Sequence, residues 1–256
     1  MPLLSVSHLA KSFGGVQAVA DVSFELDAGE LLALIGPNGA GKSTCFNMLN
    51  GQLRPDGGRV TLDGRDITAK ASRDIWQLGV GRTFQITATF GSMTVRENVQ
   101  MVMLSRARAL LGIWHSAADR FRDEATTLLA RVGMADQSER ACSLLSYGDL
   151  KRVELAMALA SEPRLLLMDE PTAGMAPRER DELMALTAEL TRERQLGVLF
   201  TEHSMDVVFT YARRVLVMAR GRVIAQGAPA AVREDAQVQE VYLGTGATFR
   251  TQAADA

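Results

Sequence analysis

The feature that most constrains this chain is a glycine-rich run that fits the pattern G-x-x-x-x-G-K-[ST]. The stretch before it, Leu31 to Ile35, has the apolar character of a buried strand, and Lys42 to Asn50 has the pattern of a helix. In such a strand–loop–helix context the backbone N–H groups of the loop surround phosphate oxygens, and the N-terminus of the helix adds positive potential. The run therefore predicts a site for the phosphates of a nucleotide, and it consists of Gly36, Pro37, Asn38, Gly39, Ala40, Gly41, Lys42, Ser43 and Thr44.

Two side chains of this loop have the chemistry to act on such a ligand. The Lys42 amine is expected to reach the β and γ phosphates, and the Ser43 hydroxyl is expected to bind Mg²⁺. The alternative is a glycine-rich turn that merely precedes a helix. The complete motif between a strand and a helix favours the phosphate site.

A second candidate feature is an apolar strand that ends in two acidic residues. Leu165 to Met168 is followed directly by Asp169 and Glu170. In phosphate-loop nucleotidases an aspartate at this position holds Mg²⁺, and Glu170 is suited to be the general base that activates the attacking water. The alternative is a strand that simply reaches solvent at these residues, but the phosphate loop upstream favours a functional pair.

Apolar runs of strand length alternate with helical patterns along the chain, which predicts an α/β fold. This alternation at both ends favours a mostly parallel sheet covered by helices. From about Thr94 to Leu159 the pattern is helical, so this part is expected to be an insertion between two halves of the sheet, and Pro229 to Leu243 has the pattern of a helical tail. The expected strands are Glu30–Ile35, Arg59–Leu62, Arg164–Met168, Val198–Thr201 and Arg214–Met218.

Composition and charge exclude several classes of protein. Hydrophobic residues make up 47% and charged residues 23% of the 256 residues, a balance typical of a globular protein and not of a disordered chain. The net charge of −2 offers no basic surface for a phosphate backbone, so nucleic acid is not an expected partner. No apolar run approaches the roughly 18 residues of a membrane helix. The first residues lack the pattern of a secretory signal, and the two cysteines fit a reducing compartment, so we expect the chain in the cytoplasm.

A short motif before the acidic strand indicates which kind of nucleotide-binding protein this is. Leu145 is followed by Ser146, Tyr147, Gly148 and Asp149, and this run resembles the signature Leu-Ser-Gly-Gly-Gln of the ATP-binding subunits of ABC transporters. Further marks of that family follow in the right order along nearly the whole chain. They are Phe13, where an aromatic residue stacks on adenine, Gln85, which resembles the Q-loop glutamine, and His203, which resembles the switch histidine.

The resemblance implies a fold and a domain layout. It implies a single ABC nucleotide-binding domain over residues 1–256, in which a phosphate-loop NTPase core has a mostly parallel sheet and an antiparallel N-terminal β portion. The ATP-binding core would comprise residues 1–85 and 161–228. An inserted α-helical subdomain with the signature would comprise residues 86–160, and a C-terminal tail residues 229–256.

The resemblance also implies that ATP and Mg²⁺ bind between two subunits that face head to tail. The phosphate loop of one subunit would bind ATP together with the signature, Ser146 to Asp149, of a paralogue or a second copy. Further expected partners are transmembrane permease subunits, one of which would place a helix in a groove near Gln85, and indirectly a periplasmic substrate-binding protein. The chain would be peripheral on the cytoplasmic face of the inner membrane. The resemblance implies that Ser43, Gln85 and Asp169 act at the metal. It implies that Lys42, Glu170 and His203 act in the hydrolysis of ATP.

Several details resemble one branch of the family, the LivG-like ATPases of importers for branched-chain amino acids. Tyr147 in place of the first glycine of the signature, the run Phe13 to Val19 and the ending Val241 to Gly244 are similar to that branch. Ala176 departs from it, since the family has an aspartate there and this branch usually an asparagine. Alanine lacks a side-chain hydrogen bond expected to cross the dimer interface, which predicts a weaker link between the two ATP sites without loss of hydrolysis.

Each of these residues also has a structural alternative. Ser146 could serve only as a helix cap, with Asp149 completing a pattern like a capping box, and Phe13 could be packed in the core. His203 and Gln85, taken alone, could be ordinary surface residues. Cys45, beside the phosphate loop, is expected to be a small buried thiol.

Other functions stay open as alternatives. The chain could serve a transporter for urea, amides, aromatic acids or an exported lipid, because the ATPase subunit does not touch the cargo. Non-transport ABC ATPases of translation or DNA repair usually carry two ATPase units or a long coiled-coil insert, whereas this sequence has one set of motifs and no sustained heptads. The signature, Gln85 and His203 together argue against a phosphate-loop kinase.

Overall fold

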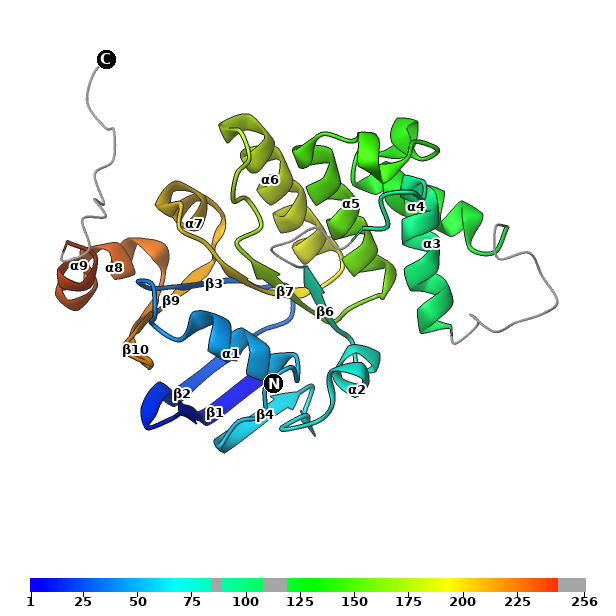
Figure 1. Ribbon diagram of the computed structural model, residues 1–256. Helices are drawn as coiled ribbons and strands as arrows, with labels where there is room; N and C mark the ends of the chain where they lie inside the picture. Colours follow the sequence, from blue (N-terminus) through cyan, green and yellow to red (C-terminus); the bar gives the residue numbers. More distant parts are fainter. Residues whose placement is uncertain (84–88, 108–118, 244–256) are drawn as a thin grey trace, which may run out of the picture.

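The computed structural model describes residues 1–83, 89–107 and 119–243, and its central element is a largely parallel β-sheet (Figure 1). The strands lie in the order β10-β9-β3-β8-β7-β6. Neighbours from β9 to β6 pair in parallel, whereas β10 is antiparallel to β9. The predicted α/β fold with a mostly parallel sheet is confirmed. Its strands are β3 (Leu31–Ile35), β6 (Val80–Thr83), β7 (Leu165–Asp169), β8 (Gly197–Thr201), β9 (Arg214–Ala219) and β10 (Arg222–Gly227).

A second, antiparallel sheet is built from the N-terminal part of the chain. Its strand order is β2-β1-β4-β5, and it lies below α1 in Figure 1. It agrees with the antiparallel N-terminal β portion that the family resemblance implies. The strands are β1 (Leu4–Phe13), β2 (Val16–Leu26), β4 (Gly57–Leu62) and β5 (Arg65–Asp66).

Strand β4 begins earlier than the sequence predicts. The expected strand was Arg59–Leu62 behind a glycine turn, but Gly57 and Gly58 already belong to the strand, and Gly57 pairs with Ala10. Gly58 has a φ of +89°, and a Cβ atom there would lie 2.5 Å from the carbonyl oxygen of His8. The ladder between β1 and β4 shifts register at this point. The two backbones approach closely there, and this approach requires glycine inside the strand.

The helices between β6 and β7 form one end of the molecule, drawn mostly in green in Figure 1. This is the helical insertion that the sequence predicts; its limits as a subdomain stay a prediction, and the expected boundary at residues 85 and 86 lies outside the described residues. The insertion contains α3 (Val95–Arg106), α4 (Arg122–Arg131), short 3₁₀ turns at Ala135–Gln137 and Cys142–Leu144, and α5 (Tyr147–Ala160). The other helices are α1 (Lys42–Leu49), α2 (Ser72–Gln77), α6 (Pro177–Glu193), α7 (Met205–Tyr211), α8 (Pro229–Glu234) and α9 (Ala236–Leu243).

Helix α5 starts at Tyr147, directly after Ser146. The reason is the cap: the Oγ atom of Ser146 accepts a hydrogen bond from the backbone N–H of Asp149 at 3.2 Å. The Asp149 carboxylate accepts a bond from the Ser146 hydroxyl at 2.9 Å. The signature residues therefore form the first turn of the helix.

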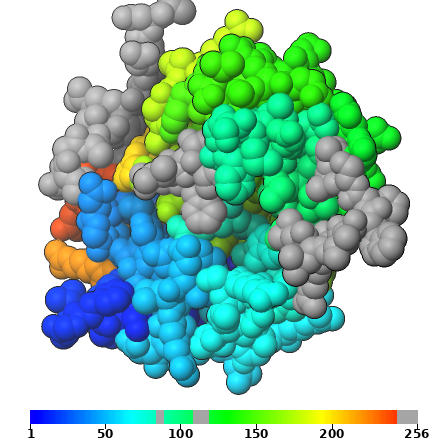
Figure 2. Space-filling model, turned by 45° about the vertical axis from the view of Figure 1, so that its right-hand side comes forward, coloured from blue at the N-terminus to red at the C-terminus, as the bar shows by residue number. Residues whose placement is uncertain are grey.

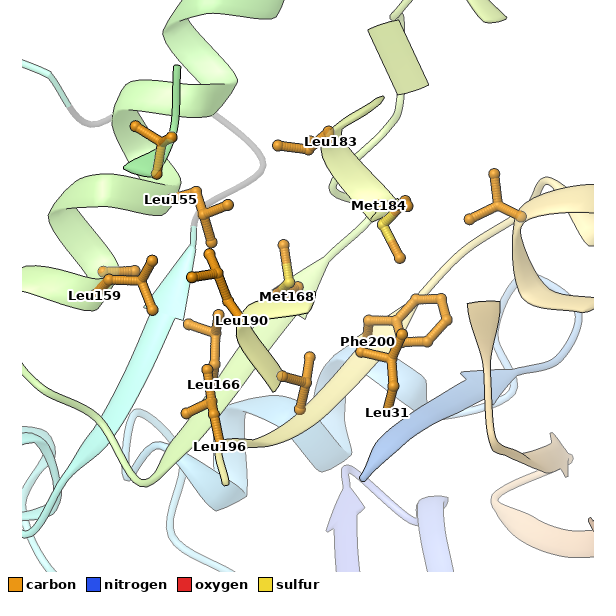
Figure 3. Close-up of a cluster of buried hydrophobic side chains, with 14 of the residues drawn as sticks. Leu31, Leu155, Leu159, Leu166, Met168, Leu183, Met184, Leu190, Leu196 and Phe200 are labelled. Atoms are coloured by element: carbon orange, nitrogen blue, oxygen red, sulfur yellow. The ribbon is translucent and has the colours of Figure 1, made fainter. Parts of the chain in front are cut away.

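The two faces of the parallel sheet pack against different layers, because side chains alternate along each strand. In β3, Leu32 and Leu34 point into a core shared with α1 and the antiparallel sheet, whereas Leu31 and Ala33 point into the core beneath the helices. In Figure 3, side chains of α5 and α6 meet those of β7 and β8 in this second core. The carboxyl ends of β3, β7 and β8 are thereby fixed side by side. Among the described helices, none combines the length and the apolar character needed to cross a bilayer.

Candidate functional site

A cavity of about 320 Å³ lies at the carboxyl ends of β3, β7 and β8. Open parallel sheets place their ligand sites at this edge. The cavity brings together the predicted residues from four separate stretches of the chain. Its lining consists of Phe13, Ala18, Asn38, Gly39, Ala40, Gly41, Lys42, Ser43, Thr44, Asp169, Glu170 and His203.

The phosphate loop turns sharply because several of its residues are glycines with positive φ. Gly36 has a φ of +152°, and a Cβ atom there would lie 2.1 Å from the carbonyl oxygen of Met218. Gly41 has a φ of +102°, and a Cβ atom there would lie 2.3 Å from the carbonyl oxygen of Ala18. No larger side chain fits at either position without a backbone shift. Gly36 and Pro37, at the start of the loop, are not part of the cavity lining.

The amine of Lys42 is buried in this loop and holds its shape. Its Nζ atom donates hydrogen bonds to the carbonyl oxygens of Gly36 at 2.6 Å and Pro37 at 3.1 Å. Burial lowers the pKa of Lys42, and the nearby carboxylates of Glu170 and Asp169 oppose that shift. The amine thus lies at the cavity wall, with two acidic groups close by.

Asp169 ends β7 with its carboxylate fixed at both oxygens. The Thr201 hydroxyl donates to Oδ1 at 2.8 Å, and the Arg82 guanidinium donates to Oδ2 at 3.2 Å. Neither partner belongs to a motif that the sequence reveals. The sequence features that could have indicated them are a threonine at the end of β8 and an arginine in β6, the strand before Gln85. Among the described residues, no three histidine, cysteine, aspartate or glutamate side chains gather as ligands, so a metal here would rely on Asp169, the Ser43 hydroxyl and the ligand's own oxygens. Mg²⁺ is commonly held in this way.

Glu170 and His203 face each other across the ends of β7 and β8. The Nε2 atom of His203 lies 2.9 Å from Oε1 of Glu170. The backbone N–H of Glu170 donates to the Thr201 hydroxyl at 3.0 Å, and Glu170 has a φ of +49°. This left-handed backbone turns the carboxylate toward the cavity. The backbone N–H of His203 donates to the buried carboxylate of Glu202 at 3.1 Å, which fixes the start of the loop after β8.

Phe13 lies at the rim of the cavity, at the end of β1. Its side chain is 49% exposed, so the alternative that it is packed in the core is wrong. The Lys11 amine lies 5.6 Å from the centre of the ring. Because the ring is half exposed at the cavity, it can stack on a flat aromatic ligand.

The signature residues are not part of this cavity. Ser146 caps α5, and Tyr147 is 42% exposed on the first turn. Gly148 packs closely against α6, since a Cβ atom there would lie 2.8 Å from the flexible carboxylate of Glu179. The chain alone therefore presents the signature as a surface separate from its own phosphate loop.

Ala176 is the N-cap residue of α6, and its side chain makes no capping bond. Its backbone N–H donates to the Glu179 carboxylate at 3.3 Å. The preceding turn approaches the signature of the same chain, because a Cβ atom placed on Gly174 would lie 3.6 Å from the Tyr147 ring. The predicted effect of Ala176 on a dimer stays a prediction.

Gln85 lies outside the described residues, so its predicted role at the metal stays a prediction. Beside Arg82 and Thr83 the structure has a second cavity, of about 240 Å³, between the core and the inserted helices. Figure 2 views the molecule from the side where cyan and green surfaces meet with a hollow between them. The lining of the cavity is largely apolar and includes Gln52, Ile75, Trp76, Arg82, Val102, Glu154 and Met157.

Two further residues lie close to the phosphate loop. Cys45 is fully buried, as predicted, and burial raises the pKa of its thiol to about 12. Tyr242 of the C-terminal tail is also buried; burial raises the pKa of its phenol, and a hydrogen bond with the backbone of Gly36 opposes this shift. The tail thereby contacts the start of the phosphate loop. In the sequence, Tyr242 is marked only as part of the ending that resembles a family.

Comparison with known families identifies two matching stretches. A family model described as ABC transporter matches residues 19–173. A second, described as branched-chain amino acid ATP-binding cassette transporter, matches residues 222–248. The second match includes Tyr242.

Individual relatives extend these matches over nearly the full chain. The high-affinity branched-chain amino acid transport ATP-binding protein LivG of Salmonella typhimurium is 39% identical over 250 residues, which cover 95% of this chain and 98% of that protein. The lipopolysaccharide export system ATP-binding protein LptB of Haemophilus influenzae is 35% identical over 244 residues, which cover 95% of this chain and 98% of that protein. A crystal structure of the ADP conformation of an ATP-binding cassette of an ABC transporter aligns with a TM-score of 0.84 at 31% identity, covering 95% of this chain and 99% of the other.

Proposed function

This chain belongs to the ABC transporter family of ATP-binding proteins, and on that basis we propose that it is the ATP-hydrolysing subunit of an importer for branched-chain or related amino acids. The cargo follows from the LivG protein, 39% identical over 95% of this chain, and from the C-terminal match at residues 222–248. ATP binding and hydrolysis supply the energy for transport.

The observation that carries the proposal is the separation of two surfaces within one chain. The cavity at the phosphate loop contains Lys42, Asp169, Glu170 and His203, yet the signature residues are not in its lining. A second subunit is needed to bring a signature to each ATP. Two subunits facing head to tail, either copies of this chain or this chain and a paralogue, complete two such sites by symmetry. ATP then bridges the subunits and favours the closed dimer, and hydrolysis removes the bridge.

The residues of this chain have separate tasks in hydrolysis. The loop N–H groups and the Lys42 amine bind the phosphates, and Phe13 stacks on adenine. Water attacks the γ-phosphorus, the bond to the β-phosphate oxygen breaks, and the Glu170 carboxylate accepts the proton of the water. His203, 2.9 Å from Glu170, orients that carboxylate and can donate a hydrogen bond to the γ-phosphate.

The oxygen donors at the phosphate loop fit Mg²⁺. The Ser43 hydroxyl and the Asp169 carboxylate line the same cavity, and hard oxygen donors of this kind suit that ion. Bound with ATP, Mg²⁺ would neutralise charge on the phosphates. The Thr201 hydroxyl orients the Asp169 carboxylate for this role. Gln85 is proposed as a further metal ligand.

The second cavity is proposed to be the contact with a transmembrane permease subunit. It is a largely apolar hollow between the core and the inserted helices (Figure 2), a shape that accepts a short helix of a partner. A subunit without a membrane-spanning helix among its described residues would reach the membrane through this contact. The chain would then be peripheral on the cytoplasmic face, with a periplasmic substrate-binding protein as an indirect partner.

Export of a lipid is the second candidate function, because the LptB protein is 35% identical over 95% of this chain. The experiment that separates the candidates is purification of the tagged chain from mildly solubilised native membranes, followed by identification of its partners. Two permease subunits, a second ATPase and an amino-acid-binding protein would support the importer. Co-purification of the subunits of a lipid exporter would replace the amino-acid cargo with a lipid. Ribosomal or DNA-repair proteins, without any membrane protein, would contradict a function in transport.

A further inference from the structure

Arg82 connects the phosphate site to the second cavity. It lies in β6 with 12% of its side chain exposed. One terminal nitrogen of its guanidinium donates to the amide oxygens of Asn47 at 2.7 Å and Gln52 at 2.8 Å. The other donates to Oδ2 of Asp169 at 3.2 Å. Within the described part of the chain, this cation thus bonds to two neutral acceptors and to one charged acceptor.

The distances show how the guanidinium is shared. Bonds between a guanidinium and a carboxylate are typically about 2.7–2.9 Å and stronger than bonds to neutral groups. Here the order is reversed, since the bond to the Asp169 carboxylate is longer than both bonds to amide oxygens. The amides hold Arg82 away from its closest approach to Asp169. A change at either amide would move the cation relative to the carboxylate.

Gln52 is the acceptor that a partner can reach. It is an exposed residue, and it lines the second cavity together with Arg82. Asn47 lies in α1, the helix that follows the phosphate loop in the sequence, and is not part of that lining. A group that contacts Gln52 in the cavity thus lies one hydrogen bond from Arg82 and two from Asp169.

We propose that Arg82 is a positioning residue through which contacts at Gln52, in the wall of the second cavity, set the affinity of Asp169 for a divalent metal. The proposal rests on the proposed function, in which Asp169 binds Mg²⁺ with the nucleotide. Arg82 and the metal compete for the same carboxylate, because both are cations. A stronger acceptor at position 52 draws Arg82 toward it and increases the affinity of Asp169 for the metal. Loss of the acceptor at position 52 decreases that affinity.

The test measures binding of Mn²⁺ to the full chain with saturating ADP, using the electron paramagnetic resonance signal of free Mn²⁺. ADP avoids turnover, so the readout is independent of activity. Gln52→Glu keeps the size of the side chain and strengthens the pull on Arg82, and it should lower the Mn²⁺ dissociation constant about threefold to tenfold. Gln52→Met removes the acceptor at similar length and should raise that constant about twofold to threefold. Equal or same-sign effects in these two variants would overturn the proposal.

A double-mutant cycle with Arg82→Met separates the action through Arg82 from the direct field of a new carboxylate. If Arg82 transmits the effect, Gln52→Glu loses most of its influence on Mn²⁺ affinity in the Arg82→Met background. An undiminished influence would assign the effect to direct attraction and overturn the proposal. Should Arg82→Met fail to fold, Arg82→Lys, which retains the charge but lacks the fork, serves in the same cycle. A wild-type chain that binds ADP but no Mn²⁺ would instead contradict the proposed metal site itself.

Discussion

The Nε2 atom of His203 lies 2.9 Å from the carboxylate oxygen Oε1 of Glu170, and both side chains face the cavity at the phosphate loop. The two residues follow adjacent strands, β7 and β8, whose register pairs Asp169 with Thr201. The parallel ladder therefore determines the distance between them. A shift of one residue in either strand would separate the carboxylate from the ring.

Replacement of Glu170 by glutamine should nearly stop hydrolysis while leaving ATP bound. The amide keeps the size of the side chain and a hydrogen bond to His203, but it cannot accept the proton of the attacking water. We expect turnover to fall about 100-fold or more, with ATP affinity within about threefold of wild type. Phosphate release and equilibrium binding of ATP measure the two quantities. Turnover like that of the wild type would remove Glu170 as the general base.

Replacement of His203 by alanine should lower turnover with little effect on ATP affinity. The change removes the group that orients Glu170, along with one donor to the γ-phosphate, and loss of one such donor typically costs about 100-fold in turnover. His8→Ala is the matched control, because His8 is an exposed histidine bonded to Asp21, outside the cavity lining. Equal losses in both variants would show that the effect is not specific to the site.

Replacement of Lys42 by alanine should abolish most ATP binding. Its amine holds the loop through Gly36 and Pro37, and it is expected to neutralise the β and γ phosphates. We expect ATP affinity to fall at least about tenfold, equivalent to 1.4 kcal/mol. Lys70→Ala, at an exposed lysine outside the cavity lining, is the control. Unchanged ATP binding in Lys42→Ala would contradict the assignment of the phosphate loop.

The parts of this molecule that sequence analysis predicted are those set by local patterns. The strand β3, the phosphate loop and helix α1 follow one another along the chain, so one motif contains all three. Asp169 and Glu170 follow an apolar run, which marks the end of a buried strand. Phe13 and His203 have no such local pattern, and they were identified only through the resemblance to a family.

What the sequence analysis missed depends on pairings between distant segments. Arg82 reaches Asp169, which is 87 positions away along the chain, because β6 and β7 are neighbours in the sheet. Gly58 lies in a strand rather than a turn because β1 approaches it. Tyr242 contacts Gly36 only because the tail returns to the phosphate loop. None of these contacts can be predicted from the neighbouring residues alone.

Replacement of Tyr242 by phenylalanine should weaken ATP binding without slowing the chemical step. The ring stays packed, and only the hydroxyl that bonds to the backbone of Gly36 is lost. A hydrogen bond of this kind contributes about 0.5–1.5 kcal/mol, so we expect KM for ATP to rise about twofold to tenfold with kcat unchanged. The control is Tyr211→Phe, which removes a hydroxyl bonded to the carbonyl oxygen of Asp181 in α6. A lower kcat with unchanged KM would contradict a role in positioning the loop.

Replacement of Ala176 by aspartate should have two effects that can be separated. Ala176 is the N-cap of α6 without a capping side chain, so aspartate or serine there should each stabilise the chain against unfolding by about 0.5–2 kcal/mol. Aspartate, longer and charged, should also restore the hydrogen bond expected across the dimer and raise the Hill coefficient for ATP hydrolysis, whereas serine should not. Urea denaturation measures the first effect, and steady-state hydrolysis by the assembled dimer measures the second. An equal rise of the Hill coefficient in both variants would show that the capped helix causes the effect. An unchanged Hill coefficient in Ala176→Asp would contradict the prediction that Ala176 weakens the link between the two ATP sites.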